Sequence, residues 1–269
     1  MVKLARQASI KPAVPTNGSH PWTVCIVGTR PGVGKTVVGG ALADHARRRG
    51  MHVGVFKPIA TGCRRTRHGL RAADAEFLAH WADTPNDLAT VNPICYRSRL
   101  IVAECARREG REVDEGAIET ARRQVLAQAD IVLIEGVGSL LEPIAANRRF
   151  ADMIGEWQIP IVLVSPADAD DIHTTLGAID FARQAGLSVW AVVLNRYRPN
   201  EATLADEMNP EWIARYGGVD LPVVVPADRD TSVRKCWLGA DVRFALTDLG
   251  NKIVDNVQPT PGTRPEIGN

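Results

Sequence analysis

The sequence GTRPGVGKT at Gly28–Thr36 is the strongest signal in this chain. It directly follows an apolar run, Thr23–Val27, and opens a helical pattern, Thr36–Arg49, that ends at Gly50. A glycine-rich turn between a strand and a helix lets several backbone N–H groups converge on phosphate oxygens, and the helix N-terminus favours their negative charge. The segment is therefore typical of a loop that binds the phosphates of a nucleotide.

The last two residues of this loop, Lys35 and Thr36, carry the side chains expected to contact the phosphates and the metal ion. We expect Lys35 to neutralise the β- and γ-phosphates and the hydroxyl group of Thr36 to ligate Mg²⁺. The strict pattern GxxxxGK[ST] is not met, because Thr29 stands at its first glycine and Gly28 lies one position earlier. We interpret the loop as a GxxxxxGKT variant. The residues expected to bind ATP are Gly28, Gly32, Val33, Gly34, Lys35 and Thr36.

Short apolar runs rich in β-branched residues alternate with helical patterns. The expected strands are Thr23–Val27, His52–Phe56, Ile131–Ile134, Ile161–Val164, Val189–Leu194 and Leu221–Val225. The expected helices are Thr36–Arg49, Ala72–Trp81, a segment after Asp114 with Ile118, Ala121, Val125 and Ala129 on one face, and Ile172–Ala185. Runs that are apolar on both faces are typical of buried parallel strands. The alternation predicts an α/β fold with a doubly wound, mostly parallel sheet and helices on both faces, as in P-loop nucleoside triphosphatases.

Composition and charge exclude several classes of protein. The 269 residues are 45% hydrophobic and 23% charged, which is typical of a globular chain. A net charge of +1 argues against a dedicated nucleic-acid-binding protein. No apolar run approaches the roughly 20 residues that cross a bilayer, so no membrane partner is expected. The five cysteines include no CxxC pair and predict neither a disulfide framework nor a zinc site, which favours a cytoplasmic protein.

We expect one domain between two irregular ends. Residues 1–21 are polar, lack the apolar core of a secretory signal and are predicted to be a flexible leader. Residues 258–269 contain three prolines and two glycines and are predicted to be a disordered tail. Residues 22–257 contain neither a long linker nor a repeat, so they are predicted to form a single ATPase domain.

Three charged residues outside the loop are further candidates. Glu135 ends the apolar run Ile131–Ile134, and an acid at the carboxyl end of a parallel strand lies at the ligand-binding edge of the sheet. Because Mg²⁺ prefers hard oxygen ligands, Glu135 is the first candidate carboxylate. Asp74 lies at the start of the expected helix Ala72–Trp81, and Lys57 ends the second strand. Taken alone, Asp74 is more typical of a charge at a helix N-terminus than of a metal ligand, and an isolated lysine at a strand end is usually a solvated charge.

Together, these segments resemble the dethiobiotin synthetase family. The matching segments, in the order and spacing of that family, are GTRPGVGKT (Gly28–Thr36), FKPIATG (Phe56–Gly62), GLRAADA (Gly69–Ala75), TVNP (Thr90–Pro93), EGVGS (Glu135–Ser139), FADM (Phe150–Met153) and VVLNR (Val192–Arg196). The GxGKT element is shared by many ATPases. Its combination with KPIATG one strand later is much more specific.

The resemblance implies an ATP- and Mg²⁺-dependent cyclo-ligase that forms dethiobiotin from 7,8-diaminononanoate and CO₂ in biotin biosynthesis. The diamine captures CO₂ as a carbamate, ATP converts the carbamate to a carbamic-phosphoric anhydride, and the second amine closes the cyclic urea. The resemblance also implies a homodimer in which the partner subunit completes each substrate site.

The same resemblance assigns roles to individual residues. Phosphoryl transfer to a carbamate oxygen depends mainly on positioning and charge neutralisation, so cations are needed near the γ-phosphate. The implied residues are the catalytic Lys57 and Lys35, the Mg²⁺ ligands Thr36, Asp74 and Glu135, the adenine contact Asn195, and the substrate contacts Thr61 and Gly136. Lys57 is similar to the family lysine that contacts the carbamate and the γ-phosphate.

The sequence departs from the family pattern mainly on the acceptor side. Arg30 stands where the family has an acidic or small polar residue, and Pro31 stands where it has a threonine. Ser139 replaces the second glycine of the EGxGG pattern, and Arg97–Val102 replaces a Ser-Pro-His segment. These departures leave open a close relative of the family reaction with another acceptor.

Arg30 also supports a different class of protein. It stands five residues before Lys35, the place of a signature lysine in the deviant Walker ATPases of the Min and Par type, which are dimerising switches. The KPIATG element fits the ligase better, and the sequence shows neither a membrane-targeting amphipathic helix in its tail nor a basic excess. A switch ATPase therefore remains the alternative hypothesis.

Overall fold

A computed structural model describes residues 21–257, so the expected leader and tail lie outside the described residues, except for Pro21. The six expected strands are β1 (Trp22–Gly28), β2 (Val53–Phe56), β7 (Ile131–Glu135), β10 (Ile161–Pro166), β11 (Val189–Tyr197) and β12 (Val223–Pro226). They form one sheet in the order β12-β11-β10-β1-β7-β2, and every neighbouring pair is parallel. The mostly parallel sheet predicted from the sequence is confirmed.

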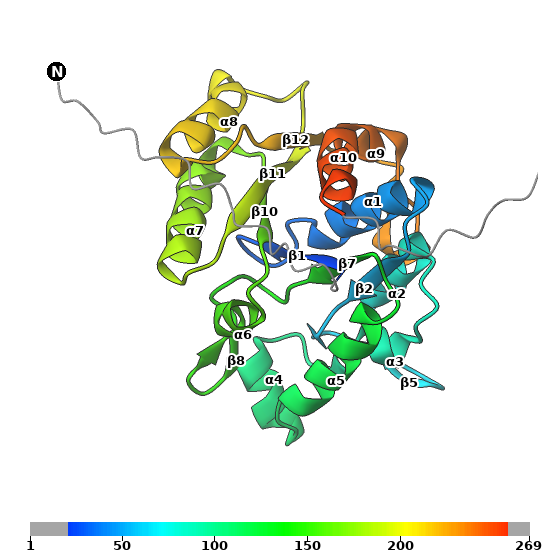
Figure 1. Ribbon diagram of the computed structural model, residues 1–269. Helices are drawn as coiled ribbons and strands as arrows, with labels where there is room; N and C mark the ends of the chain where they lie inside the picture. Colours follow the sequence, from blue (N-terminus) through cyan, green and yellow to red (C-terminus); the bar gives the residue numbers. More distant parts are fainter. Residues whose placement is uncertain (1–20, 258–269) are drawn as a thin grey trace, which may run out of the picture.

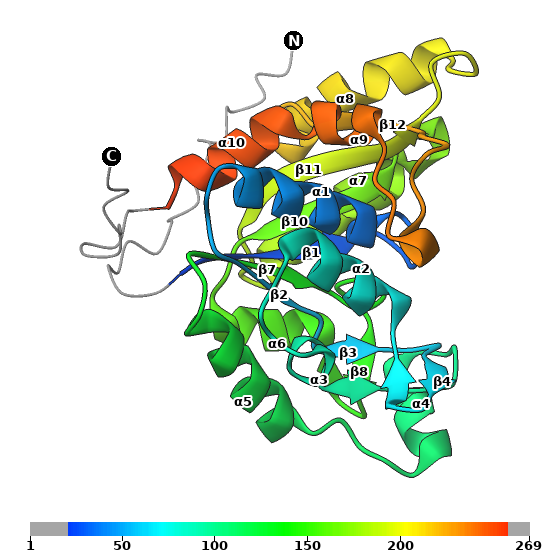
Figure 2. The same ribbon diagram turned by 90° about the vertical axis from the view of Figure 1, so that its right-hand side faces the viewer.

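Helices cover both faces of this sheet (Figures 1 and 2). The helices are α1 (Lys35–Arg48), α2 (Ala73–Ala82), α3 (Leu88–Val91), α4 (Val102–Glu109), α5 (Glu115–Leu126), α6 (Phe150–Trp157), α7 (Ile172–Gln184), α8 (Leu204–Gly217), α9 (Ala240–Ala245) and α10 (Thr247–Asp255). The apolar side chains of α1, α2, α9 and α10 pack on one face, and those of α4 to α8 pack on the other. The fold is therefore a doubly wound α/β fold of the P-loop type.

The central strand β1 explains why its sequence is apolar without interruption. Val24 and Ile26 point into the layer that contains α1, whereas Cys25 and Val27 point into the opposite layer. A strand that is buried on both faces needs apolar side chains at odd and even positions alike. This burial fixes β1 in the middle of the sheet, with the phosphate loop at its carboxyl end.

Three pairs of short strands complete the described part of the chain. β3 (Ile59–Ala60) pairs in parallel with β6 (Ile94–Cys95), and two antiparallel pairs follow, β4 (Arg64–Thr66) with β5 (Gly69–Arg71) and β8 (Pro143–Ala145) with β9 (Arg148–Arg149). The β3–β6 pair lies just beyond the carboxyl end of β2. It therefore fixes the chain that follows Lys57 beside the ligand-binding edge of the sheet.

No helix between residues 21 and 257 combines the length and apolar character that spanning a bilayer requires.

Candidate active site

The phosphate loop connects β1 to α1 through two glycines with left-handed backbone angles. Gly32 has a φ of 77°, and Gly34, which precedes the first residue of α1, has a φ of 103°. Gly28 is restricted by space, because a Cβ there would lie 2.7 Å from Val33 Cγ2 and 3.2 Å from Lys35 Nζ. The loop can close this tightly only because these positions lack side chains.

Asn195 fixes this loop from the end of β11. Its side chain is buried, and Nδ2 donates a hydrogen bond to the carbonyl of Val33 at 2.8 Å. A Cβ on Gly34 would lie 1.9 Å from the same nitrogen, so the loop and the amide leave no room for another residue. Among the described residues, Oδ1 accepts no hydrogen bond. Asn195 therefore has a structural role that the sequence did not predict, and its predicted contact with adenine stays a prediction.

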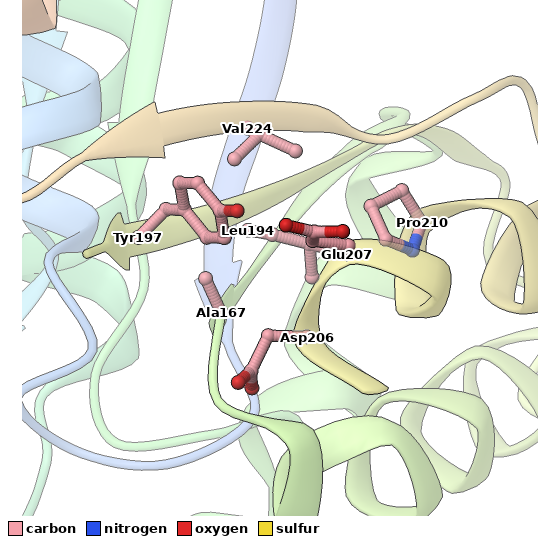
Figure 3. A pocket seen from close by; sticks show the side chains of 7 residues that line it. All are labelled: Ala167, Leu194, Tyr197, Asp206, Glu207, Pro210 and Val224. Atoms are coloured by element: carbon pink, nitrogen blue, oxygen red, sulfur yellow. The ribbon is translucent and has the colours of Figure 1, made fainter. Parts of the chain in front are cut away.

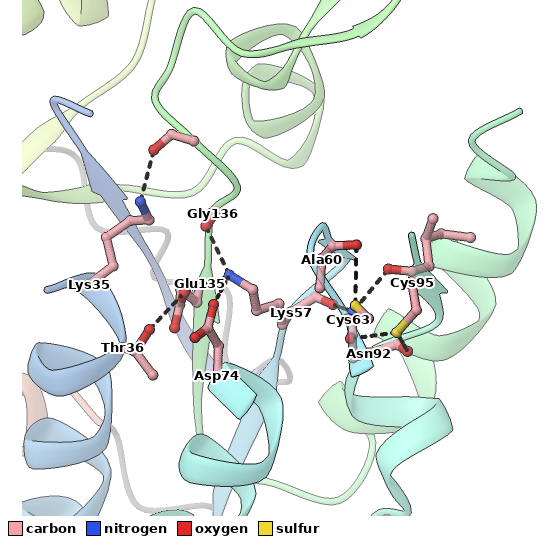
Figure 4. Close-up of polar contacts among 12 residues, drawn as sticks. Lys35, Thr36, Lys57, Ala60, Cys63, Asp74, Asn92, Cys95, Glu135 and Gly136 are labelled. Carbon is pink, nitrogen blue, oxygen red and sulfur yellow. Dashed lines mark hydrogen bonds and ion pairs between the residues drawn. The ribbon is translucent and has the colours of Figure 1, made fainter. Parts of the chain in front are cut away.

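Lys57 and Glu135 form a buried ion pair at the carboxyl ends of β2 and β7 (Figure 4). Lys57 Nζ lies 2.5 Å from Glu135 Oε1, 3.3 Å from the carbonyl oxygen of Gly136 and 3.4 Å from Asp74 Oδ2. The Lys57 side chain is only 4% exposed, whereas that of Asp74 is 43% exposed. Because β7 lies next to β2 in the sheet, the two strands bring these charges together.

Burial and charge shape the electrostatics of this pair. Burial lowers the pKa of Lys57, but the attraction of Glu135 and Asp74 outweighs it, so the pKa lies above its ordinary value. Burial also raises the pKa of Glu135, while Lys57 opposes this effect. The ammonium group of Lys57 thus stays charged at the edge of the sheet, where a phosphoryl group could approach.

Lys35 points along the same edge from the start of α1. Its Nζ donates a hydrogen bond to the carbonyl of Gly138 at 2.8 Å. Burial, and to a lesser extent repulsion by Lys57, lowers the pKa of Lys35 to about 8. A bound anion such as a phosphate group would stabilise its charged form. The two lysines named by the sequence analysis therefore lie in one cluster with Glu135.

The oxygen atoms in this cluster fit a Mg²⁺ ion. Thr36 Oγ1 donates to Glu135 Oε1 at 3.1 Å, and Glu135 Oε2 is buried without a hydrogen-bond partner among the described residues. A buried carboxylate oxygen without a partner is costly unless a cation or water satisfies it. With Asp74 nearby, a hydroxyl oxygen and two carboxylates form the hard donor set that Mg²⁺ prefers.

Gly136 follows Glu135 and leaves no space for a side chain. Its N–H donates to the carbonyl of Ile26 at 2.9 Å, and a Cβ would lie 2.7 Å from Phe150 Cε1. Its carbonyl faces Lys57, as described above. Gly136 thus contributes backbone atoms to the cluster.

Thr61, a predicted substrate contact, makes no hydrogen bond to this cluster. It is half-buried directly after β3, and its hydroxyl makes no hydrogen bond within residues 21–257. The next residue, Gly62, donates its N–H to the carbonyl of Ser98 at 2.8 Å and lies against the side chain of Arg99. The segment that departs from the family pattern therefore packs directly on the predicted acceptor side.

Arg30 points away from the carboxylate cluster. Its guanidinium lies 3.5 Å from Asp171, just before α7, and its side chain is 52% exposed. The phosphate loop is thus tied through Arg30 to the segment between β10 and α7, whereas Lys57 lies on the other side of β1. Ser139, another position that departs from the family pattern, accepts a hydrogen bond from the N–H of Leu141 at 3.2 Å.

Comparisons with known proteins show the family to which this chain belongs. A family model described as an AAA domain matches residues 22–234. The ATP-dependent dethiobiotin synthetase of Anaeromyxobacter sp. (strain K) is 31% identical over 215 residues, which cover 80% of this chain and 94% of that protein. The chain belongs to the dethiobiotin synthetase family. A second member of that family, ATP-dependent dethiobiotin synthetase 1 of Salmonella typhi, is 32% identical over 82% of this chain and 92% of its own length.

A solved structure outside the dethiobiotin synthetase family supports the fold. The MinD cell division protein of Aquifex aeolicus superposes with a TM-score of 0.52 at 12% identity, covering 88% of this chain and 99% of that protein. At this identity the likeness shows the P-loop fold alone.

Two residues near the site were not predicted to have a role. Asn92 Nδ2 donates to the carbonyl of Lys57 at 2.7 Å and so holds the end of β2. Glu142 Oε1 accepts a hydrogen bond from the N–H of Val102 at 2.9 Å, which caps α4 from a distant segment. Asn92 lies in the TVNP segment that resembles the dethiobiotin synthetase family, so a signal for it was present. Nothing in the local sequence points to Glu142.

A separate cavity of about 340 Å³ opens between α8 and the sheet (Figure 3). It is lined by Ala167, Leu194, Tyr197, Asp206, Glu207, Pro210 and Val224. None of these residues belongs to the lysine–carboxylate cluster. Leu194 points into the layer of α7 and α8, on the opposite face of the sheet from α1. The cavity is therefore distinct from the lysine–carboxylate cluster.

Proposed function

We propose that this protein is an ATP- and Mg²⁺-dependent cyclo-ligase that forms dethiobiotin from 7,8-diaminononanoate and CO₂ in biotin biosynthesis. The observation that carries this proposal is the position of Lys57, which is buried at the carboxyl edge of the sheet against Glu135 and Asp74. The dethiobiotin synthetases to which the chain is similar support the choice of reaction.

In this proposal, Lys57 and Lys35 carry the catalysis. Their ammonium groups neutralise the negative charge that builds up between the carbamate oxygen and the γ-phosphate, and so stabilise the carbamic-phosphoric anhydride as it forms. The loop residues Gly28, Gly32, Val33 and Gly34 hold the phosphates through their backbone. Asn195 Oδ1 is free to accept a hydrogen bond from the adenine amino group.

Thr36, Asp74 and Glu135 would hold Mg²⁺. When bound, the ion supplies charge neutralisation for the phosphates of ATP. Glu135 also orients Lys57 through their shared hydrogen bond, so the same carboxylate aligns the catalytic lysine and the metal ligands.

The acceptor side depends on Thr61 and Gly136, with Arg99 close to Gly62. We propose that residues 22–257 act as one ATPase domain in the cytoplasm, and that a homodimer completes each acceptor site. Nine large apolar side chains among the described residues are exposed, including Leu141, Leu204 and Phe244, and such residues are candidates for a subunit contact.

The alternative, a dimerising switch ATPase, depends on Arg30 as a signature cation. In the structure Arg30 pairs with Asp171 of its own chain. A residue with its charge already compensated is less suited to reach the phosphates of a partner subunit. The ligase therefore remains the better supported function.

Phosphate release tests the proposal directly. The protein is incubated with ATP, Mg²⁺ and bicarbonate, with and without 7,8-diaminononanoate. We expect release that depends on the diamine, together with dethiobiotin detected by mass spectrometry. Release without dethiobiotin, stimulated instead by another protein, by DNA or by lipid vesicles, would support the switch ATPase.

A Lys57→Ala variant separates catalysis from nucleotide binding. We expect diamine-dependent phosphate release to fall by about 10²-fold or more, while the Kd for ATP changes much less, because Lys57 is assigned to the transferred group. Lys252→Ala, which removes an exposed lysine from α10, is the matched control. An equal loss of ATP binding and turnover in Lys57→Ala would contradict the assigned role.

A further inference from the structure

Cys63 and Cys95 bring two thiols together next to the acceptor side. β3 and β6 pair with Ala60 opposite Cys95, and the N–H of Cys63 donates to the carbonyl of Tyr96 at 2.9 Å. The thiol of Cys63 donates to the carbonyl of Ala60, which also accepts the N–H of Tyr96, and the side chains of Cys63 and Cys95 pack in the same apolar cluster. Figure 4 shows both cysteines beside Asn92, within the same group of polar contacts as Lys57. The proposed reaction uses neither thiol.

The two thiols differ in access and acidity. Cys63 is buried, whereas Cys95 is half-buried. The neighbouring thiol of Cys63 lowers the pKa of Cys95 against the effect of burial, and the charges of Arg111 and Arg71 lower it further. The neighbouring thiol of Cys95 and burial raise the pKa of Cys63. We therefore expect Cys95 to react first with an oxidant and Cys63 to react second.

The cysteine pair is linked to two residues of the candidate active site, to Lys57 through hydrogen bonds and to Thr61 through the chain. As a thiol, Cys95 lies 2.9 Å from Asn92 Oδ1 and donates to it, and Asn92 Nδ2 donates to the carbonyl of Lys57. Cys63 lies two residues after Thr61. A change of bonding at the two sulfur atoms thus acts on the backbone that positions both Lys57 and Thr61.

We propose that Cys63 and Cys95 are a reversible disulfide site that a low-molecular-weight disulfide such as oxidised glutathione converts to its oxidised form. The backbone bond from Cys63 to Tyr96 holds Cys63 beside the end of β6, so the two cysteines lie on neighbouring segments, as a disulfide requires. The other three cysteines lie on other segments, Cys25 in β1, Cys105 in α4 and Cys236 before α9. The pair is therefore distinct from the remaining cysteines of the described chain.

The reaction is two successive thiol–disulfide exchanges. The Cys95 thiolate attacks one sulfur of oxidised glutathione, a mixed disulfide forms, and one glutathione thiolate leaves. The Cys63 thiolate then attacks the sulfur of Cys95 and displaces the second glutathione. The two protons lost by the cysteines are taken up by the two glutathione thiolates, and the oxidant gains the two electrons.

Oxidation removes the S–H donor that bonds Asn92 Oδ1 and joins the chain after Thr61 to β6. We expect diamine-dependent phosphate release to fall roughly tenfold or more, since a displacement of about 1 Å at a reacting group has effects of this size. ATP binding is expected to change little, because the phosphate loop lies on another strand. This effect on turnover rests on the proposed function, whereas disulfide formation does not.

Peptide mapping of the full chain tests the disulfide. The protein is treated with oxidised glutathione, alkylated, digested and analysed by mass spectrometry with and without a reductant. We expect peptides that carry Cys63 and Cys95 to be linked, and two of the five cysteines to become protected from alkylation until reduction. A persistent glutathione adduct on Cys95, or a link from either residue to Cys105, would overturn the proposal.

Single variants provide the controls. Cys95→Ser keeps a hydroxyl donor for Asn92, so we expect reduced-state turnover to persist and sensitivity to oxidised glutathione to disappear. Cys236→Ser, which removes another half-buried thiol, should leave that sensitivity intact. Linked peptides without any loss of turnover would refute the effect on the active site. If the reduced protein makes no dethiobiotin, the proposed function fails while the peptide map still decides the disulfide.

Discussion

Glu135 is buried among two ammonium groups and a hydroxyl group, and one of its carboxylate oxygens has no protein partner in the described part of the chain. A buried carboxylate is strongly disfavoured unless a cation or hydrogen bonds compensate its charge. The ammonium group of Lys57 binds Oε1, so a second cation would be stabilised most by binding at Oε2. At the scale of single residues, this atom is the strongest indication of a metal site.

Replacing Glu135 by glutamine tests that indication. Glu135→Gln keeps the shape of the side chain but removes its charge, so we expect turnover to fall by on the order of 10²-fold and the Mg²⁺ dependence to weaken. Binding of ATP without Mg²⁺ should change little. Initial rates over a Mg²⁺ titration measure the effect, with the exposed Glu201→Gln as the control. Unchanged rates in Glu135→Gln would remove this residue from the site.

Helices α1 and α2 pack closely because two glycines of α1 face α2. A Cβ on Gly40 would lie 2.3 Å from Phe77 Cε1, and one on Gly39 would lie 2.9 Å from Leu78 Cδ2. Helical glycines cost about 1 kcal/mol relative to alanine, so at these positions packing outweighs propensity. At the scale of elements, this contact sets the distance from α2, which carries Asp74, to the phosphate loop.

Two glycine-to-alanine variants distinguish the effect of helix packing on the free energy of unfolding from the effect of helix propensity. Gly40→Ala is expected to lower the free energy of unfolding by about 1–3 kcal/mol, because the added methyl group overlaps Phe77. Gly177→Ala, in the middle of α7, meets no atom within 4 Å and is expected to raise stability by up to about 1 kcal/mol. Chemical denaturation of both variants measures the difference. A stabilising Gly40→Ala would contradict the close contact between the two helices.

At the scale of the whole molecule, the candidate site depends on strand order. β7 lies between β1 and β2, so Glu135 is adjacent to both the phosphate loop and Lys57, although long segments separate them in the chain. β11 brings Asn195 to the loop from the other half of the sheet. A nucleotide bound here would contact residues from several strands at once, and its binding would stabilise the fold as a whole.

Thermal unfolding measures this coupling. With Mg²⁺ and ATP at about a hundred times the Kd, we expect the folded state to gain about 2.7 kcal/mol and the Tm to rise accordingly. Lys35→Ala should lose most of this gain, because its ammonium group is assigned to the phosphates. A Tm that does not respond to Mg²⁺ and ATP in the unaltered protein would argue against the nucleotide site.

Several elements could not be predicted from the sequence. α8 contains Pro210 and exposes Leu204 and Met208, so its apolar residues form no continuous stripe. α9 has six residues, and its one buried residue, Val242, is enclosed by packing on the other helices of this face. Helical periodicity is visible only where one face of a helix is apolar along its length.

The sequence by itself determined the parallel sheet, the phosphate loop and its lysine, because these depend on the spacing of apolar residues and glycines along a short length of chain. The residues alone named Lys57, Asp74 and Glu135 as separate candidates, and the family resemblance grouped them into one site. Only the tertiary structure decided that Lys57 contacts both carboxylates, that Asn195 holds Val33, and that Cys63 lies beside the end of the strand that carries Cys95. Such contacts follow from strand order and register, which bring distant residues together and leave no trace in the local sequence.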